Sequence, residues 1–389
     1  MSVLAILAFW SCAAVVGWAY VGYPLLVAVL SERMGDAPYE AEPGSDEATP
    51  PLTVVVAAYD EQARIATRII DILAQDYPAD RLRVLVVSDG SRDRTVEVAR
   101  LAAGGDPRVE VLALPRNEGK AAALNAAMAH ADTPVVAFAD ARQRFAPGAL
   151  RALVAPFADP LVGSVSGELV IEEAAPGDAS VRPQAVGLYW RMEKRLRFDE
   201  ARLEWLHGVT GAVHAVRRER FRPLPPGTIL DDMWIPLQVA FDGYRVWMAR
   251  AAVARDRGSA DPGEEFARKL RTLAGNWQLV ARMPALLHPL RNPVFFAWFS
   301  HKFLRLMVPW ALLLALPASA LAPGLFYRFA LAAQLLGYGW AALGLALPRL
   351  GARMPLQPAA GTFVMLNLAA LLSLPASLAP DATRLWKKH

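Results

Sequence analysis

Long apolar runs lie near both ends of the chain and frame a segment of mixed composition. Residues 3–30 contain no acidic or basic side chain and are long enough to cross a bilayer with some tilt. Three further runs, at 303–321, 325–347 and 361–379, have the length of membrane-spanning helices, although one of the four could re-enter the membrane or lie in its interface. The pattern predicts an N-terminal transmembrane helix and a C-terminal transmembrane region.

The first apolar run is expected to be a retained helix rather than a cleaved signal peptide. No positive segment precedes it, its apolar core is too long, and no small-residue cleavage site follows it. Its Cys12 is the one cysteine of the chain, so an intrachain disulfide is impossible, which suits a reducing compartment for the globular part. Lys and Arg crowd the flanks that face the central segment, which predicts a cytoplasmic globular domain.

The central segment alternates between strand-like and helix-like patterns. Buried strands are expected at the apolar runs 52–61, 82–88, 109–114 and 134–140. Helical periodicity occupies 63–75, a stretch that begins near 95, and 120–131. Strands separated by such helices predict a mostly parallel sheet with right-handed crossovers, an α/β fold. The expected parts are an N-terminal helix at 1–33, a linker at 34–51, a globular domain at 52–260, amphipathic interface helices at 261–300 and transmembrane segments at 301–389.

Polar residues follow several of these strands at the edge where a parallel sheet binds its ligand. They are Asp60, Glu61, Asp89 and Asp140, with Lys120 at the start of a helix. One such aspartate alone could be a turn former or a helix cap, but several strand ends together indicate a binding crevice. We expect Asp89 to be solvated in the empty crevice. The loop after the first strand contains no glycine, so a dinucleotide site is not expected.

The four motifs "VVVAAYDEQARI", "VLVVSDGSRDRT", "RNEGKAAALNAAM" and "FADA", in this order, resemble the nucleotide-binding half of glycosyltransferase family 2. The close match covers about 52–145, and a looser one continues through 208–221 and 229–248. With its apolar ends, the chain is similar to the membrane branch that includes cellulose, chitin and hyaluronan synthases. The resemblance implies a GT-A-like fold, a mostly parallel sheet with flanking helices, in the globular domain.

The resemblance implies a nucleotide-sugar site at the strand ends. Asp89 would accept hydrogen bonds from the uracil ring or the ribose, with Asp60 and Glu61 beside it. Asp60 stands where the family usually has asparagine, which removes two hydrogen-bond donors. Lys120 would attract the nucleotide's phosphates.

The segment 135–145, "VVAFADARQRF", departs from the family's D-x-D pattern. Asp140 matches the first aspartate, which contacts the sugar-nucleotide, but Arg142 stands at the second, which ligates Mg²⁺ or Mn²⁺. Asp140 and the diphosphate could hold the metal alone, or Arg142 could clamp diphosphate oxygens, or Arg142 could point away as a surface residue. A divalent metal is expected, with Asp140 as its protein ligand.

Inversion at the anomeric carbon needs a base that deprotonates the acceptor hydroxyl. By resemblance Asp232 is this base and Asp231 is the acidic residue before it. Adjacent carboxylates in a partly desolvated cleft raise each other's proton affinity, which moves the base toward working pH. The alternative is an N-cap pair on the following helix, which is compatible with a catalytic role.

The basic amphipathic stretch 264–290 could lie in the membrane interface. Processive relatives carry Q-x-x-R-W there, whereas this chain offers Arg271, Trp277 and Gln278 in another order. We expect these residues to contact acceptor or diphosphate, with an interface anchor as the alternative for Trp277.

The expected function is an inverting, multi-pass membrane glycosyltransferase of the inner membrane with a cytoplasmic domain. It would move sugar from a nucleotide-sugar, expected to be a UDP-sugar, to a growing polysaccharide or a lipid-linked acceptor. Its partners would be the nucleotide-sugar donor, the saccharide or lipid-linked acceptor and the lipid bilayer, and no nucleic acid is expected to bind. One rival interpretation is a non-catalytic scaffold with a degenerate fold, which the retained carboxylates argue against. Another is a transporter, which the missing G-x-x-x-x-G-K-[ST] loop argues against.

Overall fold

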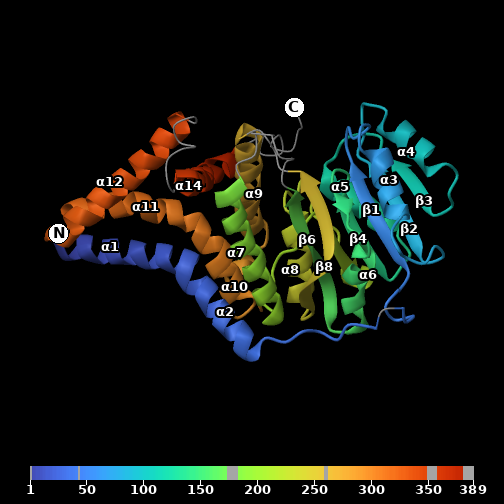
Figure 1. Cartoon of the computed structure of the whole chain (residues 1–389), viewed down its shortest axis with the longest axis horizontal. Helices are drawn as coiled ribbons and strands as arrows, with labels where there is room; N and C mark the ends of the chain where they lie inside the picture. The colour runs from blue at the N-terminus through green and yellow to red at the C-terminus, as the bar shows by residue number, and fades with distance from the viewer. Residues whose placement is uncertain (1, 43, 173–182, 258–261, 348–356, 380–389) are drawn as a thin grey trace.

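A computed structural model describes the chain at residues 2–42, 44–172, 183–257, 262–347 and 357–379. The end of the predicted C-terminal region, 380–389, lies outside these residues. An α/β domain forms one side of the molecule, and a bundle of apolar helices extends from it as an arm with the N-terminus at its tip (Figure 1).

One mixed sheet forms the centre of the α/β domain. Its strands run in the order β3-β2-β1-β4-β7-β6-β8-β5. The first four are parallel, as the sequence predicts, and β7 pairs with β4 in the antiparallel direction. The strands are β1 (Leu52–Ala58), β2 (Leu82–Ser88), β3 (Val109–Ala113), β4 (Val135–Asp140), β5 (Arg144–Phe145), β6 (Val162–Glu172), β7 (Val213–Arg217) and β8 (Arg245–Arg257).

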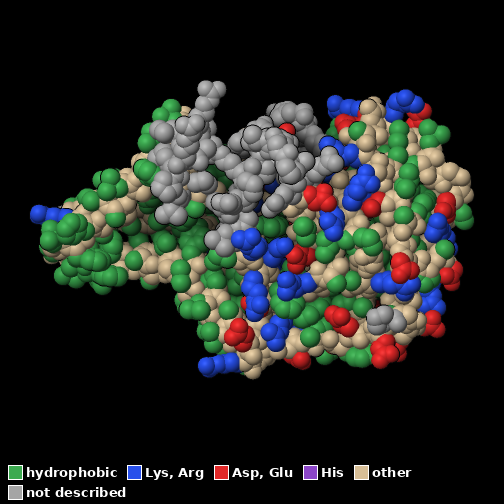
Figure 2. Space-filling view, viewed as in Figure 1, with side chains coloured by type: hydrophobic (Ala, Val, Ile, Leu, Met, Phe, Trp, Pro, Cys, Tyr) green, Lys and Arg blue, Asp and Glu red, His purple; other side chains and the backbone are tan. Residues whose placement is uncertain are grey.

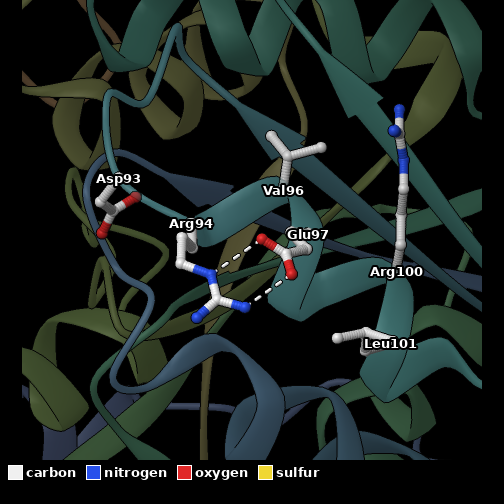
Figure 3. A pocket seen from close by; sticks show the side chains of 6 residues that line it. All are labelled: Asp93, Arg94, Val96, Glu97, Arg100 and Leu101. Carbon is white, nitrogen blue, oxygen red and sulfur yellow. Dashed lines mark hydrogen bonds and ion pairs between the residues drawn. The ribbon is translucent and has the colours of Figure 1, made fainter.

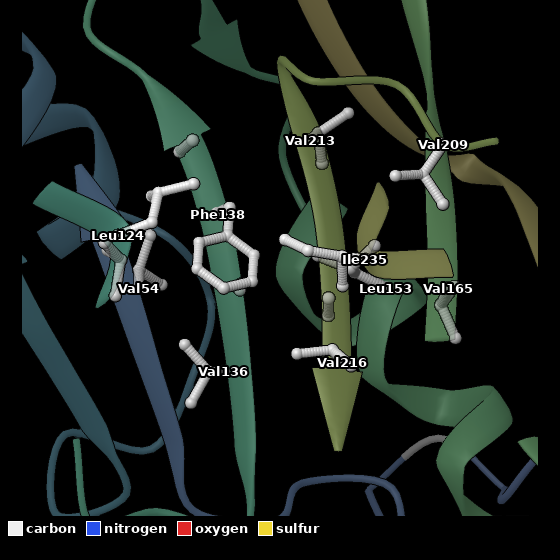
Figure 4. Close-up of a cluster of buried hydrophobic side chains, with 14 of the residues drawn as sticks. Val54, Leu124, Val136, Phe138, Leu153, Val165, Val209, Val213, Val216 and Ile235 are labelled. Atoms are coloured by element: carbon white, nitrogen blue, oxygen red, sulfur yellow. The ribbon is translucent and has the colours of Figure 1, made fainter. Parts of the chain in front are cut away.

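Helices cover both faces of the sheet, which explains the continuous apolar character of its central strands. In β1 only Ala57 is not fully buried. Phe138 of β4, Leu124 of α5 and Ile235 of α8 belong to one core that continues across the sheet (Figure 4). The helices of this domain are α3 (Ile65–Leu73), α4 (Thr95–Ala103), α5 (Lys120–His130), α6 (Ala149–Val154), η2 (Ala155–Ala158), η3 (Arg218–Arg220) and α8 (Asp231–Phe241).

Three of the described helices are long and apolar enough to cross a membrane: Ser2–Met34, Phe295–Leu321 and Ala359–Leu378. The run predicted as a further span does form a helix, α12 (Leu325–Ala346), but it is not among these three. On the face shown in Figure 2, apolar side chains dominate the arm, whereas most of the charged side chains lie on the α/β domain. The parts of the three long helices are α1 (Ser2–Gly17), η1 (Trp18–Gly22), α2 (Tyr23–Met34), α10 (Phe295–Trp298), η5 (Phe299–Phe303), α11 (Leu304–Leu321) and α14 (Gln357–Leu378).

Two helices join the arm to the sheet domain. They are α7 (Pro183–Arg202), which packs against α2, and α9 (Pro262–Arg282), which packs against α14 and is followed by η4 (Pro284–Leu287). The Tyr23 hydroxyl of α2 donates to Glu200 Oε1 of α7 at 2.6 Å, in a fully buried position. The apolar helices are therefore tied to the α/β domain by buried polar contacts as well as by packing.

Candidate active site

The loops after β1 and β2 are fastened to each other at the edge where the sheet was expected to bind its ligand. Asp60 has a left-handed backbone, with φ of 52°, and its carboxylate accepts a hydrogen bond from the Arg92 N–H at 2.8 Å. Gly90 has φ of 62°, and a Cβ there would meet the backbone of Arg116 at 2.3 Å. Glycine is therefore required at this turn, because the next loop passes directly over it.

Asp89 is buried, so the expectation that it is solvated is wrong. Its side chain lies under the loop that leads into α5, and only 3% of the residue is exposed. Its two oxygens accept hydrogen bonds from the backbone N–H groups of Glu118 (2.9 Å) and Gly119 (2.8 Å). Asp89 therefore fixes the position of the loop that presents Lys120.

Lys120 joins the strand-end carboxylate of β4 to the start of α8. Its ammonium lies 3.2 Å from Asp140 Oδ1 and 3.0 Å from Asp231 Oδ2. Burial lowers the pKa of Lys120, but the carboxylates of Asp140 and Asp231 outweigh burial and leave that pKa above its ordinary value. The predicted donor and acceptor residues thus meet around one fixed positive charge.

Asp232 follows Asp231 in the first turn of α8, and its side chain faces away from Lys120 into a cavity. Burial and the neighbouring Asp231 carboxylate raise the pKa of Asp232 to about 7, although Lys120 and Arg197 oppose the shift. The N-cap residue is Leu230, so the two aspartates are not a capping pair. An acidic first turn nonetheless interacts favourably with the helix dipole. The arrangement leaves Asp232 able to accept a proton near neutral pH.

The cavity that Asp232 faces has a volume of about 320 Å³ and reaches the apolar helices. The cavity is lined by charged and imidazole side chains that were not predicted from the sequence as site residues. They are Glu193, Arg197, Glu200, His207, Lys269, His301, Lys302 and Arg305. One signal was available in the sequence, since Lys302 and Arg305 sit at the start of an apolar run, and ionisable residues in such runs often have a function.

Arg142 does not lie free at the strand end. Its guanidinium forms an ion pair with Asp256 of β8, and the neighbouring Gln143 amide donates to the same carboxylate at 2.9 Å. Asp256 is buried, whereas the Arg142 side chain is 41% exposed. Asp256 therefore neutralises most of the charge with which Arg142 would clamp a diphosphate.

Three residues of α9 were expected to contact the acceptor or the diphosphate, and they differ in whether they lie near the other site residues. Arg271 lies within electrostatic reach of the site: burial and Arg268 lower the pKa of its guanidinium, and the carboxylates of Asp140 and Asp232 oppose that shift. Trp277 instead donates to Ser373 of α14 at 3.0 Å, as an anchor between α9 and the apolar helices would. Gln278 uses both ends of its amide on the backbone of Ile229 and Gly227, just before α8.

A further hollow lies over the first turns of α4, away from these groups (Figure 3). Its Arg94 forms two hydrogen bonds with Glu97, at 2.8 and 2.6 Å, and both side chains are more than half exposed. Such a solvated pair one helical turn apart contributes little and indicates no chemistry.

Two places in the described residues have the donor atoms for a divalent metal. At the strand end Asp140 offers one carboxylate, 39% exposed, which fits the preference of Mg²⁺ for one or two carboxylates together with phosphate oxygens. Elsewhere Glu200, His207 and His301 bring ligand atoms within 4.8 Å of one another. There the two ring nitrogens of His301 already lie within hydrogen-bond distance of Glu193 (2.7 Å) and Glu200 (2.8 Å), so contacts among the side chains account for the cluster.

Comparison with known proteins shows the family to which the chain belongs. The model of the family "Glycosyl transferase family 2" matches residues 53–224. An N-acetylglucosaminyltransferase of Rhizobium leguminosarum bv. trifolii is 35% identical over 128 residues, which cover 32% of this chain and 70% of the relative. The chain belongs to glycosyltransferase family 2. The family assignment that the strand-end motifs predicted is thus confirmed.

Two other family 2 similarities differ in coverage. An N-acetylglucosaminyltransferase of Rhizobium meliloti (strain 1021) is 34% identical over 165 residues, 42% of this chain, but the match spans only 38% of that relative. The solved structure of a mannosyltransferase from Pyrobaculum calidifontis, in complex with GDP-Man and Mn²⁺, superposes with a TM-score of 0.68 at 25% identity. The superposition covers 95% of this chain and 99% of the mannosyltransferase chain, and it therefore includes the apolar helices. The predicted GT-A-like fold is confirmed.

Proposed function

We propose that this family 2 protein is an inverting membrane glycosyltransferase that moves a sugar from a nucleotide-sugar to a hydroxyl group of a polysaccharide or lipid-linked acceptor. A UDP-sugar is the proposed donor. The observation that carries the proposal is the position of Asp232, which faces a cavity with its pKa raised while its neighbour Asp231 is bound through Lys120 to Asp140.

In the proposed reaction the acceptor oxygen attacks the anomeric carbon of the donor from the side opposite the nucleotide. The bond between that carbon and the diphosphate oxygen breaks, and its electron pair leaves with the nucleoside diphosphate. Asp232 takes the proton of the acceptor hydroxyl and later releases it to solvent. Lys120 is placed to stabilise negative charge that develops on the diphosphate, because its ammonium lies beside Asp140 at the strand end.

A divalent metal would be held by Asp140 and by the donor's own phosphate oxygens, and it would supply positive charge to the leaving group. The Mn²⁺ in the mannosyltransferase complex supports this assignment. Arg142 contributes less than the sequence suggested, because Asp256 neutralises it.

We further propose that the apolar helices cross the inner membrane and hold the transferase domain on the cytoplasmic side. The basic flanks of these helices on the domain side support that orientation, and the three helices of sufficient length support the membrane location.

The deciding experiment is nucleotide release from the purified full chain with a panel of UDP- and GDP-sugars, with Mn²⁺ or with excess chelator. We expect release from one donor, strongest with Mn²⁺, and no release by a Lys120→Met variant. Lack of release from every donor would support the alternative of a non-catalytic scaffold. Full activity in chelator would remove the metal from the proposal.

A further inference from the structure

The cavity beside Asp232 extends from the active site to the apolar helices. At one end it is lined by Asp232 and Gly208 of the α/β domain. At the other end it is lined by Tyr20, Leu306 and Asn367, one from each of the three helices long enough to span a membrane. A molecule in this cavity can therefore contact the base and the membrane-facing helices together.

Among the described residues that line the cavity, four are Lys or Arg and three are carboxylates: Arg197, Lys269, Lys302 and Arg305 against Glu193, Glu200 and Asp232. Glu193 is shared by Arg305 (2.8 Å), His301 (2.7 Å) and Lys302 (3.6 Å). The other carboxylate at this end, Glu200, is bound by Tyr23 and His301. Lys302 and Arg305 stand near the start of a candidate membrane span, where a charged side chain is costly and usually serves a ligand or pathway.

Arg197 adds a cation with no carboxylate partner. Its guanidinium donates to the oxygens of Thr210 (3.1 Å), Ser166 (3.3 Å) and Gly208 (3.2 Å), all of them neutral. No carboxylate of the described residues lies within ion-pair distance of it. Burial lowers the pKa of its guanidinium, and the more distant carboxylates of Glu193, Glu200 and Asp232 only partly oppose that shift. A half-buried cation held only by neutral groups leaves room for an anion, whose binding would offset the cost of burial.

We propose that this cavity binds the phosphate or diphosphate group of a membrane lipid that carries the acceptor sugar. Lys302, Arg305 and Arg197 hold the phosphate, the sugar hydroxyl reaches Asp232, and the hydrocarbon chain leaves between the apolar helices. This inference rests on the proposed function and narrows its acceptor. A neutral polysaccharide would gain nothing from the fixed positive charge, and a water-soluble acceptor would gain nothing from the opening toward apolar helices.

The test is a binding measurement on the full chain in neutral detergent, with saturating UDP so that the donor site is filled. The probes are decyl diphosphate N-acetylglucosamine, the uncharged decyl N-acetylglucosaminide and inorganic diphosphate. We expect the lipid diphosphate to bind at least about tenfold more tightly than either control probe, because it alone combines charge-assisted hydrogen bonds to the diphosphate with burial of the hydrocarbon chain. Equal binding of the charged and uncharged lipids, or equal binding of lipid and inorganic diphosphate, overturns the proposal.

Variants locate the binding site. Lys302→Gln should remove most of the preference for the charged lipid. Arg197→Gln, whose amide can still donate to the neutral oxygens of Thr210 and Gly208, provides a second variant at a residue that holds the phosphate. Arg328→Gln, an exposed cation at the start of α12, is the matched control and should leave the preference unchanged. An unaltered preference in both pocket variants would contradict the assignment.

The nucleotide-release assay distinguishes failure of this inference from failure of the proposed function. Donor turnover without any preference for the charged lipid would retain the transferase and reject the lipid site. Preference for the charged lipid without release from any donor would retain the site and reject the transferase.

Discussion

At the scale of single residues, Asp231 and Asp232 are adjacent in sequence but have different surroundings. Asp231 is buried and lies 3.0 Å from the Lys120 ammonium, whereas Asp232 faces the cavity with a raised pKa. The Lys120 ammonium already occupies the Asp231 carboxylate, whereas the Asp232 carboxylate is open to the cavity. The division of roles therefore follows from the direction in which each side chain points.

Asp232→Asn should reduce turnover by about 10²–10⁴-fold, the usual contribution of a general base, because the amide keeps the shape but cannot take a proton. Donor affinity should change little. Single-turnover rates with a calorimetric donor titration would check both. A larger loss of turnover in Asp231→Asn than in Asp232→Asn would mean that the roles of the two aspartates are reversed.

The pH profile offers an independent check of the base. Because Asp232 must be deprotonated to act and its pKa is about 7, kcat/KM should rise as the pH rises through the neutral range. Asp231→Asn removes the neighbouring negative charge, so the pKa of Asp232 should fall and the acid limb should move to lower pH. An acid limb that stays in place in Asp231→Asn would show that another group titrates.

Asp89→Ala should weaken both donor binding and the fold. The substitution removes the carboxylate that accepts from the N–H groups of Glu118 and Gly119, and a hydrogen bond to a charged group contributes about 1.5–3 kcal/mol. Thermal unfolding and donor calorimetry would measure the two effects. Asp106→Ala is a suitable control, because Asp106 also accepts a backbone N–H but is part-exposed; an equal loss of stability in the control would contradict the role given to Asp89.

At the scale of elements, the start of α8 is held from outside the helix. Gln278 of α9 accepts the Ile229 N–H at 3.0 Å and donates to the Gly227 carbonyl at 2.9 Å. The sequence correctly predicted β1 to β4 and the helices between them, because apolar periodicity is a local signal. It could not predict that Gln278 supports a loop about fifty residues earlier, since that depends on how α9 packs.

Gln278→Leu should lower kcat while leaving donor affinity near its original value. The substitution keeps the side-chain volume but removes both contacts to the loop before α8, so Asp232 should be held less well in place. Turnover and donor binding would be measured on the same preparation. A loss of donor affinity with unchanged kcat would instead place Gln278 on the donor side.

At the scale of the whole molecule, the apolar helices and the α/β domain line one cavity between them. Apolar runs in the sequence located these helices, but nothing local indicated that Glu193, His301 and Arg305 would meet, because more than a hundred residues separate the first from the other two. Such contacts depend on tertiary packing, and the part of the cavity that the apolar helices line was therefore not predicted.

Tyr23→Phe should lower the unfolding temperature, because it removes a buried hydrogen bond to the Glu200 carboxylate where the arm meets the domain. A hydrogen bond to a charged group contributes about 1.5–3 kcal/mol, which corresponds to a shift of several degrees. Tyr327→Phe is the matched control, since its hydroxyl accepts from Trp10 at an exposed position at the far end of the arm. Equal shifts in the two variants would contradict a special role for the junction.

The π-helical turn η1 has a consequence for how this protein tolerates change. Each added residue rotates an α-helix by about 100°, and a π turn takes in one extra residue without breaking the helix. Beyond η1 the buried positions Tyr23, Val27 and Ser31 follow one another at intervals of four, and Trp18 within the turn donates to Ser300 of the facing π turn at 3.1 Å. A substitution along this helix changes only the contacts of the side chain that is replaced. Loss of one residue within Trp18–Gly22 would return the turn to regular α-helix and leave the flanking segments in register. An insertion or deletion of a single residue in Tyr23–Met34 would instead turn every side chain beyond it away from α7, so this part of the helix should accept variation in residue type far more readily than variation in length.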